Sequence, residues 1–164
     1  MGRSALLILY SCHQGNTERI AECMARVLDA PVQNPWQIEE LERYDLIGFG
    51  SGIYDGKHHL SLLELADRLP ETANKRAFLF STDGMPRRFM KDQRALTKKM
   101  GSDHAALRDR LQAKGYEIIG EFNCAGYNTN SFLKYLGGFN KNRPNAKDRI
   151  DAAVFAQGLK EEYL

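Results

Sequence analysis

The fold of this chain is decided by the stretch Leu6-Leu7-Ile8-Leu9-Tyr10-Ser11-Cys12-His13-Gln14-Gly15-Asn16-Thr17-Glu18-Arg19-Ile20-Ala21. An apolar run typical of a buried strand leads into a polar loop and then into a segment with apolar side chains at spacings of three and four. That spacing predicts an amphipathic helix over residues 17–28. Because the N-terminus of a helix has unpaired N–H groups and partial positive charge, this junction is suited to binding an anion.

The rest of the chain continues the alternation of strands and helices. Apolar, partly β-branched runs at residues 5–10, 44–50, 76–81 and 116–123 predict strands, and residues 59–69, 103–114 and 145–161 predict further helices. A short additional strand is predicted within residues 30–35, where two prolines allow only an edge position. The fold class is therefore α/β: a doubly wound five-stranded parallel sheet of order 2-1-3-4-5, with helices on both faces. Ligands of such sheets bind beyond the carboxyl ends of the strands.

Composition narrows the functional classes. The length of 164 residues predicts one domain over 1–164, and the formal net charge of +2 is too mild to indicate a nucleic-acid partner. No apolar run reaches transmembrane length and the N-terminal run is too short for a signal peptide, so no membrane span and a cytoplasmic location are expected. Three cysteines without CxxC spacing favour reduced thiols, and the four histidines do not reproduce a metal-ligand spacing.

The polar loop after the first strand has the donors to hold a phosphate. Ser11, Asn16 and Thr17 offer hydroxyl and amide groups, and Gly15 lets the backbone approach closely, although the loop contains no Lys or Arg. Neither a Walker A run nor a GxGxxG fingerprint occurs at this turn. The alternative is a plain strand-to-helix turn with Thr17 near the helix cap and Cys12 as a small loop residue.

The stretch from Ser11 to Thr17 resembles the phosphate-binding loop of flavodoxins, and the resemblance covers nearly the whole chain. Flavodoxins commonly place hydroxyl residues just ahead of the Gly-Asn-Thr, whereas this chain has His13 and Gln14. The resemblance implies FMN as the cofactor, and a mononucleotide-sized loop agrees with FMN rather than FAD. The implied phosphate contacts are Ser11, His13, Gln14, Gly15, Asn16 and Thr17.

Two further stretches are similar to the loops that contact the flavin ring in this family. In residues 48–59, Tyr54 offers a stacking face that would disfavour the fully reduced flavin; in residues 79–86, hydroxyl and N–H groups could meet the polar edge of the ring. The alternatives are a rim aromatic at Tyr54 and a plain turn at residues 84–86. The implied ring contacts are Gly52, Ile53, Tyr54, Gly56, Lys57, Ser81, Thr82, Asp83 and Gly84.

Two segments outside these loops are also functional candidates. Residues 124–141 form a long connection rich in glycine and asparagine, where Tyr127 and Phe139 could line the flavin mouth or simply pack within the loop. Residues 87–99 are basic, and they are interpreted either as a solvated insertion or as a docking face for an acidic redox partner. Residues 81–88 contain no aromatic residue, which leaves one ring face to Met85 or to a partner.

The resemblance implies an FMN-binding protein that transfers electrons between redox partners. The sequence does not identify those partners, and it leaves a homodimer open. The alternative is an FMN-dependent oxidoreductase of the quinone or protoporphyrinogen dehydrogenase type, because residues 52–59 also resemble that branch. A flavin-free module of the response-regulator type would need an acidic pair after the first strand, where this chain has Ser11 and Cys12.

Overall fold

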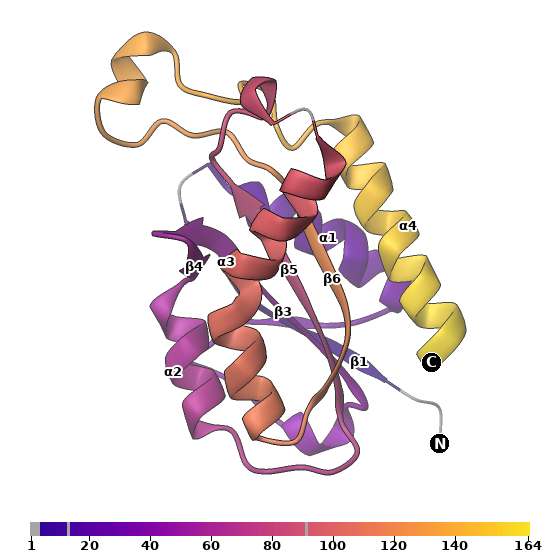
Figure 1. Ribbon diagram of the computed structural model, residues 1–164. Coiled ribbons are helices and arrows are strands. Elements are labelled where there is room, and N and C mark those ends of the chain that lie inside the picture. The colour runs from indigo at the N-terminus through magenta and orange to yellow at the C-terminus, as the bar shows by residue number, and fades with distance from the viewer. Residues whose placement is uncertain (1–3, 13, 91) are drawn as a thin grey trace.

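A parallel sheet with helices on both faces organises the computed structural model, which describes residues 4–12, 14–90 and 92–164 (Figure 1). The parallel strands have the order β2-β1-β3-β5-β6, which confirms the predicted 2-1-3-4-5 topology. The strands are β1 (Ala5–Tyr10), β2 (Val32–Gln33), β3 (Leu46–Tyr54), β4 (Lys57–His58), β5 (Arg76–Asp83) and β6 (Glu117–Ala125).

The helices cover the two faces of the sheet in pairs (Figure 1). One face packs on α1 (Asn16–Leu28) and α4 (Ala146–Tyr163), and the other packs on α2 (Leu60–Arg68) and α3 (Gln93–Ala113). The central strands are therefore buried on both sides, which explains why their sequences read as continuous apolar runs rather than as alternating ones. Within the described residues, no helix is long and apolar enough to cross a membrane.

A two-residue turn adds a sixth strand to the five that were predicted. β3 continues beyond residue 50 to Tyr54, and Asp55 and Gly56 then reverse the chain into β4, where Lys57 pairs with Tyr54 in antiparallel register. Both turn residues have positive φ, 49° and 74°, as a type I′ turn requires, and an Asp-Gly pair is a strong signal for such a turn. The hairpin holds the Tyr54 backbone in the sheet.

The basic segment, residues 87–99, contains one short helix and the start of a longer one. Residues 87–89 form a short 3-10 helix, η2 (Arg87–Phe89), and α3 begins at Gln93, ten residues before the predicted start at 103. The Asp92 side chain caps α3 by accepting a hydrogen bond from the Arg94 N–H at 2.9 Å. The first turns of α3 are largely exposed, so they lack the apolar period that marks its buried second half.

Candidate functional site

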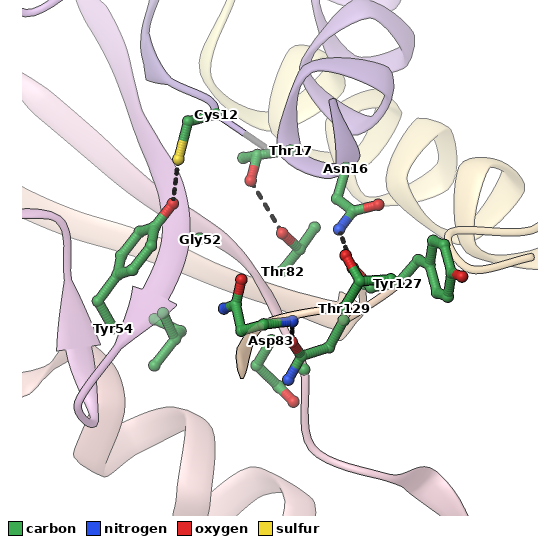
Figure 2. Close-up of a pocket in the computed structure, with 14 residues that line it drawn as sticks. Cys12, Asn16, Thr17, Gly52, Tyr54, Thr82, Asp83, Tyr127 and Thr129 are labelled. Carbon is green, nitrogen blue, oxygen red and sulfur yellow. Dashed lines mark hydrogen bonds between the residues drawn. The ribbon is translucent and has the colours of Figure 1, made fainter. Parts of the chain in front are cut away.

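A polar pocket opens at the carboxyl ends of the strands, where four chain segments meet (Figure 2). The segments are the loop between β1 and α1, the end of β3, the end of β5, and the connection that follows β6. The lining residues are Cys12, Asn16, Thr17, Gly52, Ile53, Tyr54, Thr82, Asp83, Gly84, Gly126, Tyr127, Asn128, Thr129 and Asn130. This is the position at which doubly wound sheets bind their ligands.

The loop before α1 has hydrogen-bonding groups that the described protein does not use. Gln14 and Gly15 take positive φ values of 64° and 62°, and Gly15, the residue before α1, provides no side-chain cap for the first N–H groups of the helix. The Ser11 Oγ and the Asn16 Oδ1 atoms are buried and have no hydrogen-bond partner among the described residues. Because buried polar atoms are nearly always paired in folded proteins, these groups are candidates to bind a ligand at this loop.

Two side chains at the start of α1 tie the pocket walls together (Figure 2). The Asn16 Nδ2 donates to the Tyr127 carbonyl at 2.9 Å, and the Thr17 hydroxyl lies 2.8 Å from the Thr82 hydroxyl. A Cβ atom on Gly126 would lie 2.8 Å from the Asn16 Nδ2, so only glycine permits this close approach. The start of α1 is thus fixed to β5 and to the connection after β6.

The Tyr54 ring is fixed at the opposite wall. Its hydroxyl lies 2.9 Å from the Cys12 Sγ, and its ring meets the His59 ring edge-on with centroids 5.3 Å apart. His59 in turn stacks on Tyr10, with centroids 3.5 Å apart. Burial raises the pKa of Tyr54 well above its usual value of 10, so this side chain is a neutral phenol at physiological pH. Tyr54 is a rigid aromatic surface of the kind that a planar ligand can stack against.

A buried pair of histidines lies on the α3 face of the sheet. The Ser51 hydroxyl donates to the Gly52 carbonyl, so it accepts from the Nδ1–H of His58, with 2.9 Å between the Oγ and Nδ1 atoms. The His104 Nε2 lies 2.7 Å from the Ser81 hydroxyl, and the two histidine rings have centroids 4.7 Å apart. The His58 Nε2 is buried without a described partner. Burial, with His104 as a secondary cause, holds the pKa of His58 well below 6.5, so His58 is neutral.

Glu121 on β6 holds His104 and Arg108 of α3 against the sheet. Its carboxylate accepts from the His104 Nδ1 at 3.0 Å and from the Arg108 Nε at 2.6 Å. Burial alone would raise the pKa of Glu121, but the hydrogen bonds from His104 and Arg108 outweigh it and lower the pKa to about 2. Glu121 therefore stays ionised over the physiological pH range, and it fixes which His104 nitrogen carries a proton.

The Asp83 carboxylate shapes the loop that follows β5. It is 5% exposed, accepts from the Met85 N–H, and receives two hydrogen bonds from the Arg87 guanidinium at 3.1 and 2.9 Å. Arg87 also donates to the Asn123 Oδ1 at 2.8 Å, and Asn140 donates to the Met85 carbonyl at 2.9 Å. The loops after β5 and β6 are thereby held to one another through charged and amide side chains.

The structure brings together eight of the residues that were predicted to contact a cofactor. The predicted residues that line the pocket are Asn16, Thr17, Gly52, Ile53, Tyr54, Thr82, Asp83 and Gly84. Gly56 and Lys57 lie in the exposed turn after Tyr54, and Gln14 is exposed beside the pocket. Ser81 points to the α3 face, where its hydroxyl is bonded to His104. Ser11 and Gly15 belong to the loop before α1 but are not among the residues that line the pocket, and His13 lies outside the described residues.

Sequence analysis missed part of the pocket lining. Cys12 was considered only as a loop residue, and the stretch after β6 contributes Gly126 and three polar residues, Asn128, Thr129 and Asn130. The high content of asparagine in the connection after β6 was the sequence feature that could have indicated these pocket residues. Tyr127 lines the pocket, whereas Phe139 pairs its backbone with Asn128 and has its ring under the Arg88 guanidinium.

Comparison with known proteins places the chain in a family. The family model described as a flavodoxin domain matches residues 7–128, and the chain therefore belongs to the flavodoxin-domain family. An uncharacterised protein of Methanocaldococcus jannaschii is 45% identical over 157 residues, which cover 94% of this chain and 97% of that protein.

Solved structures share the fold. Oxidised flavodoxin 2 from Bacillus cereus superposes with a TM-score of 0.64 at 20% identity, covering 99% of this chain and 100% of that one. A flavodoxin from the domain Archaea gives a TM-score of 0.62 at 15% identity, covering 98% of both chains.

Proposed function

We propose that the protein binds FMN in the pocket at the carboxyl ends of the strands and uses it to transfer electrons between redox partners. The observation that carries this proposal is the loop before α1, where the Ser11 hydroxyl is buried without a described partner beside an uncapped helix N-terminus. Such a loop suits the terminal phosphate of FMN, because N–H and O–H groups can donate to its oxygens. Membership of the flavodoxin-domain family supports the same cofactor.

The unused groups also fit the rest of the cofactor. The Asn16 Oδ1 can accept but not donate a hydrogen bond, so it suits a ligand hydroxyl of the ribityl chain rather than a phosphate oxygen. Tyr54 provides an aromatic surface, and the backbone groups of Gly52 and Gly84 line the same pocket. Bound FMN would supply one- and two-electron redox chemistry, and the protein residues would set the reduction potentials through stacking, hydrogen bonds and local charge.

The experiment is a titration of the purified protein with FMN, followed by stepwise anaerobic reduction while the visible spectrum is recorded. Saturable binding that shifts the flavin bands, with reduction in two separated one-electron steps, is the result expected for a carrier. Reduction in a single two-electron step, together with turnover of a quinone or a porphyrinogen, would favour the oxidoreductase instead. If no FMN binds at any concentration tested, the proposed function is wrong.

A further inference from the structure

The positive charge of the chain is concentrated in two segments. Residues 83–99 and 126–143 contain nine Lys or Arg and two Asp, whereas the other 129 residues contain 14 Lys or Arg and 19 Asp or Glu. The two segments follow β5 and β6, so they lie at the end of the molecule where the pocket opens (Figure 1). The molecule is therefore positive at the pocket mouth and negative elsewhere, and this asymmetry produces a field that steers charged partners.

Some of these cations are paired within the protein, and others are available to interact with a partner. The cations Arg87, Lys99 and Arg143 each pair with an aspartate and stabilise the loops. Five other cations are exposed and form no ion pair within the described part of the chain, and they are called the basic rim: Arg88, Arg94, Lys98, Lys134 and Lys141.

Large apolar side chains are exposed among these cations. Phe89 is 71% exposed, and Tyr135 and Leu136 at the tip of the connection after β6 are 80% and 73% exposed. The Arg88 guanidinium lies 4.7 Å from the centre of the Phe89 ring, and the Lys134 ammonium lies 4.9 Å from the centre of the Tyr135 ring. Exposed aromatic residues combined with arginine are typical of protein-protein interfaces.

We propose that the basic rim, with Phe89, Tyr135 and Leu136, is the docking surface for an acidic redox protein. The inference rests on the proposed function, since it assigns the chemistry of the partner that exchanges electrons at the pocket. Charge complementarity selects a partner with a negative face. A compact acidic protein can contact the basic rim alone. An extended polyanion or an anionic membrane would also approach the rest of the molecule, whose net negative charge repels it. The interface of such a transient complex is small, below about 1,200 Å².

The test is the rate of electron transfer from a reduced, acidic [2Fe–2S] ferredoxin to the FMN-loaded protein, measured by stopped flow as a function of ionic strength. The test variant is Arg88→Glu/Arg94→Glu/Lys98→Glu. The matched control is Arg26→Glu/Arg68→Glu/Lys160→Glu, which makes the same charge change at exposed positions in the last turns of α1, α2 and α4, at the opposite end of the molecule from the rim. We expect the wild-type second-order rate constant to fall about tenfold or more between low and high salt. The rim variant should be at least about tenfold slower at low salt and insensitive to salt, with the control within about threefold of wild type.

The possible outcomes distinguish a failure of the proposed function from a failure of the docking inference. If the wild-type protein binds no FMN, the proposed function fails. If FMN binds but both variants lose the same rate, net charge rather than the rim sets the rate, and the docking inference is overturned. Calorimetry of the oxidised ferredoxin with the FMN-free protein at low salt gives a readout without the cofactor, and binding should disappear only in the rim variant. Rim-dependent binding of duplex DNA or of phosphatidylserine vesicles that is tighter than ferredoxin binding would also overturn it.

Discussion

At the scale of single residues, the Ser11 hydroxyl tests how the phosphate is held. Its Oγ is buried and has no partner among the described residues, so Ser11→Ala removes a group that the folded protein does not need. We expect the affinity for FMN to fall about tenfold or more, because a hydrogen bond to a charged group contributes roughly 1.5–3 kcal/mol. Titrations with FMN and with riboflavin provide the measurement.

Riboflavin is the control ligand, since it has the same ring and ribityl chain but no phosphate. Its affinity should not change in Ser11→Ala, and Ser102→Ala, at an exposed position on α3, should alter neither affinity. Equal losses for FMN and riboflavin in Ser11→Ala would show that the hydroxyl does not serve the phosphate.

Tyr54 gives the complementary prediction for the ring. Tyr54→Phe keeps the aromatic surface and loses only the contact with the Cys12 thiol, so FMN and riboflavin affinities should each stay within about threefold of wild type. Tyr54→Ala removes the surface, and both affinities should fall about tenfold or more, which corresponds to about 1.4 kcal/mol. Fluorescence titration with each ligand measures the change, and an effect of Tyr54→Ala on FMN alone would argue against stacking.

At the scale of the elements, the histidine pair between β4 and α3 makes stability depend on pH. The pKa of His58 in the folded protein is well below 6.5, so the unfolded chain takes up a proton first as the pH falls. The free energy of unfolding should therefore be highest above about pH 6.5 and decrease below it, by up to about 1.4 kcal/mol per pH unit for one proton. Urea unfolding at intervals between pH 8 and pH 5 measures this slope.

His58→Asn is the matched variant, because asparagine can still donate to the Ser51 hydroxyl but does not titrate. Its slope between pH 6.5 and 5 should be smaller than that of wild type, while the contribution of His59, whose pKa burial also lowers, remains in both proteins. An unchanged slope would contradict a neutral buried His58.

Glu121 affects stability at lower pH. Its pKa of about 2 lies below the usual 4.5, so its contribution to the free energy of unfolding is present above pH 4.5 and is lost as the pH falls toward 2.

The exposed first turns of α3 depend on their cap. Asp92→Ala removes the acceptor for the Arg94 N–H and should destabilise the protein by about 1 kcal/mol, because the cap satisfies an otherwise unpaired donor. Hydrogen exchange of the amides in residues 93–99 should accelerate in this variant. Asp109→Ala, an exposed aspartate within α3, is the control and should change neither quantity.

The elements also show how far sequence reasoning reaches. β1 was predicted with its observed bounds because six consecutive apolar residues end at a polar loop. The start of α3 was missed because its first turns bury little, and apolar periodicity detects only what is buried. Ser81 and Thr82 were predicted to act together, yet adjacent residues of a strand point to opposite faces. Thr82 therefore lines the pocket, whereas Ser81 bonds to His104, a partner 23 residues away that no local pattern reveals.

At the scale of the whole molecule, the pocket joins segments from β1, β3, β5 and the connection after β6, so a ligand bound there should stabilise the fold as a unit. Binding to the folded state alone contributes about 2.7 kcal/mol when the FMN concentration is one hundred times the dissociation constant. For a chain of this size that corresponds to a rise in Tm of roughly 5 to 10 °C, measured by circular dichroism with and without FMN.

The same thermal measurement tests what the Ser11 hydroxyl contributes to FMN binding and to the fold. In Ser11→Ala, at the FMN concentration used for wild type, the stabilisation should be smaller by about 1.4 kcal/mol, because a tenfold weaker affinity reduces the mass-action term by that amount. The Tm without FMN should match wild type, since the hydroxyl has no partner in the described protein. If the variant melts lower without FMN, Ser11 supports the fold itself. The burial of its hydroxyl would then need an explanation other than phosphate binding.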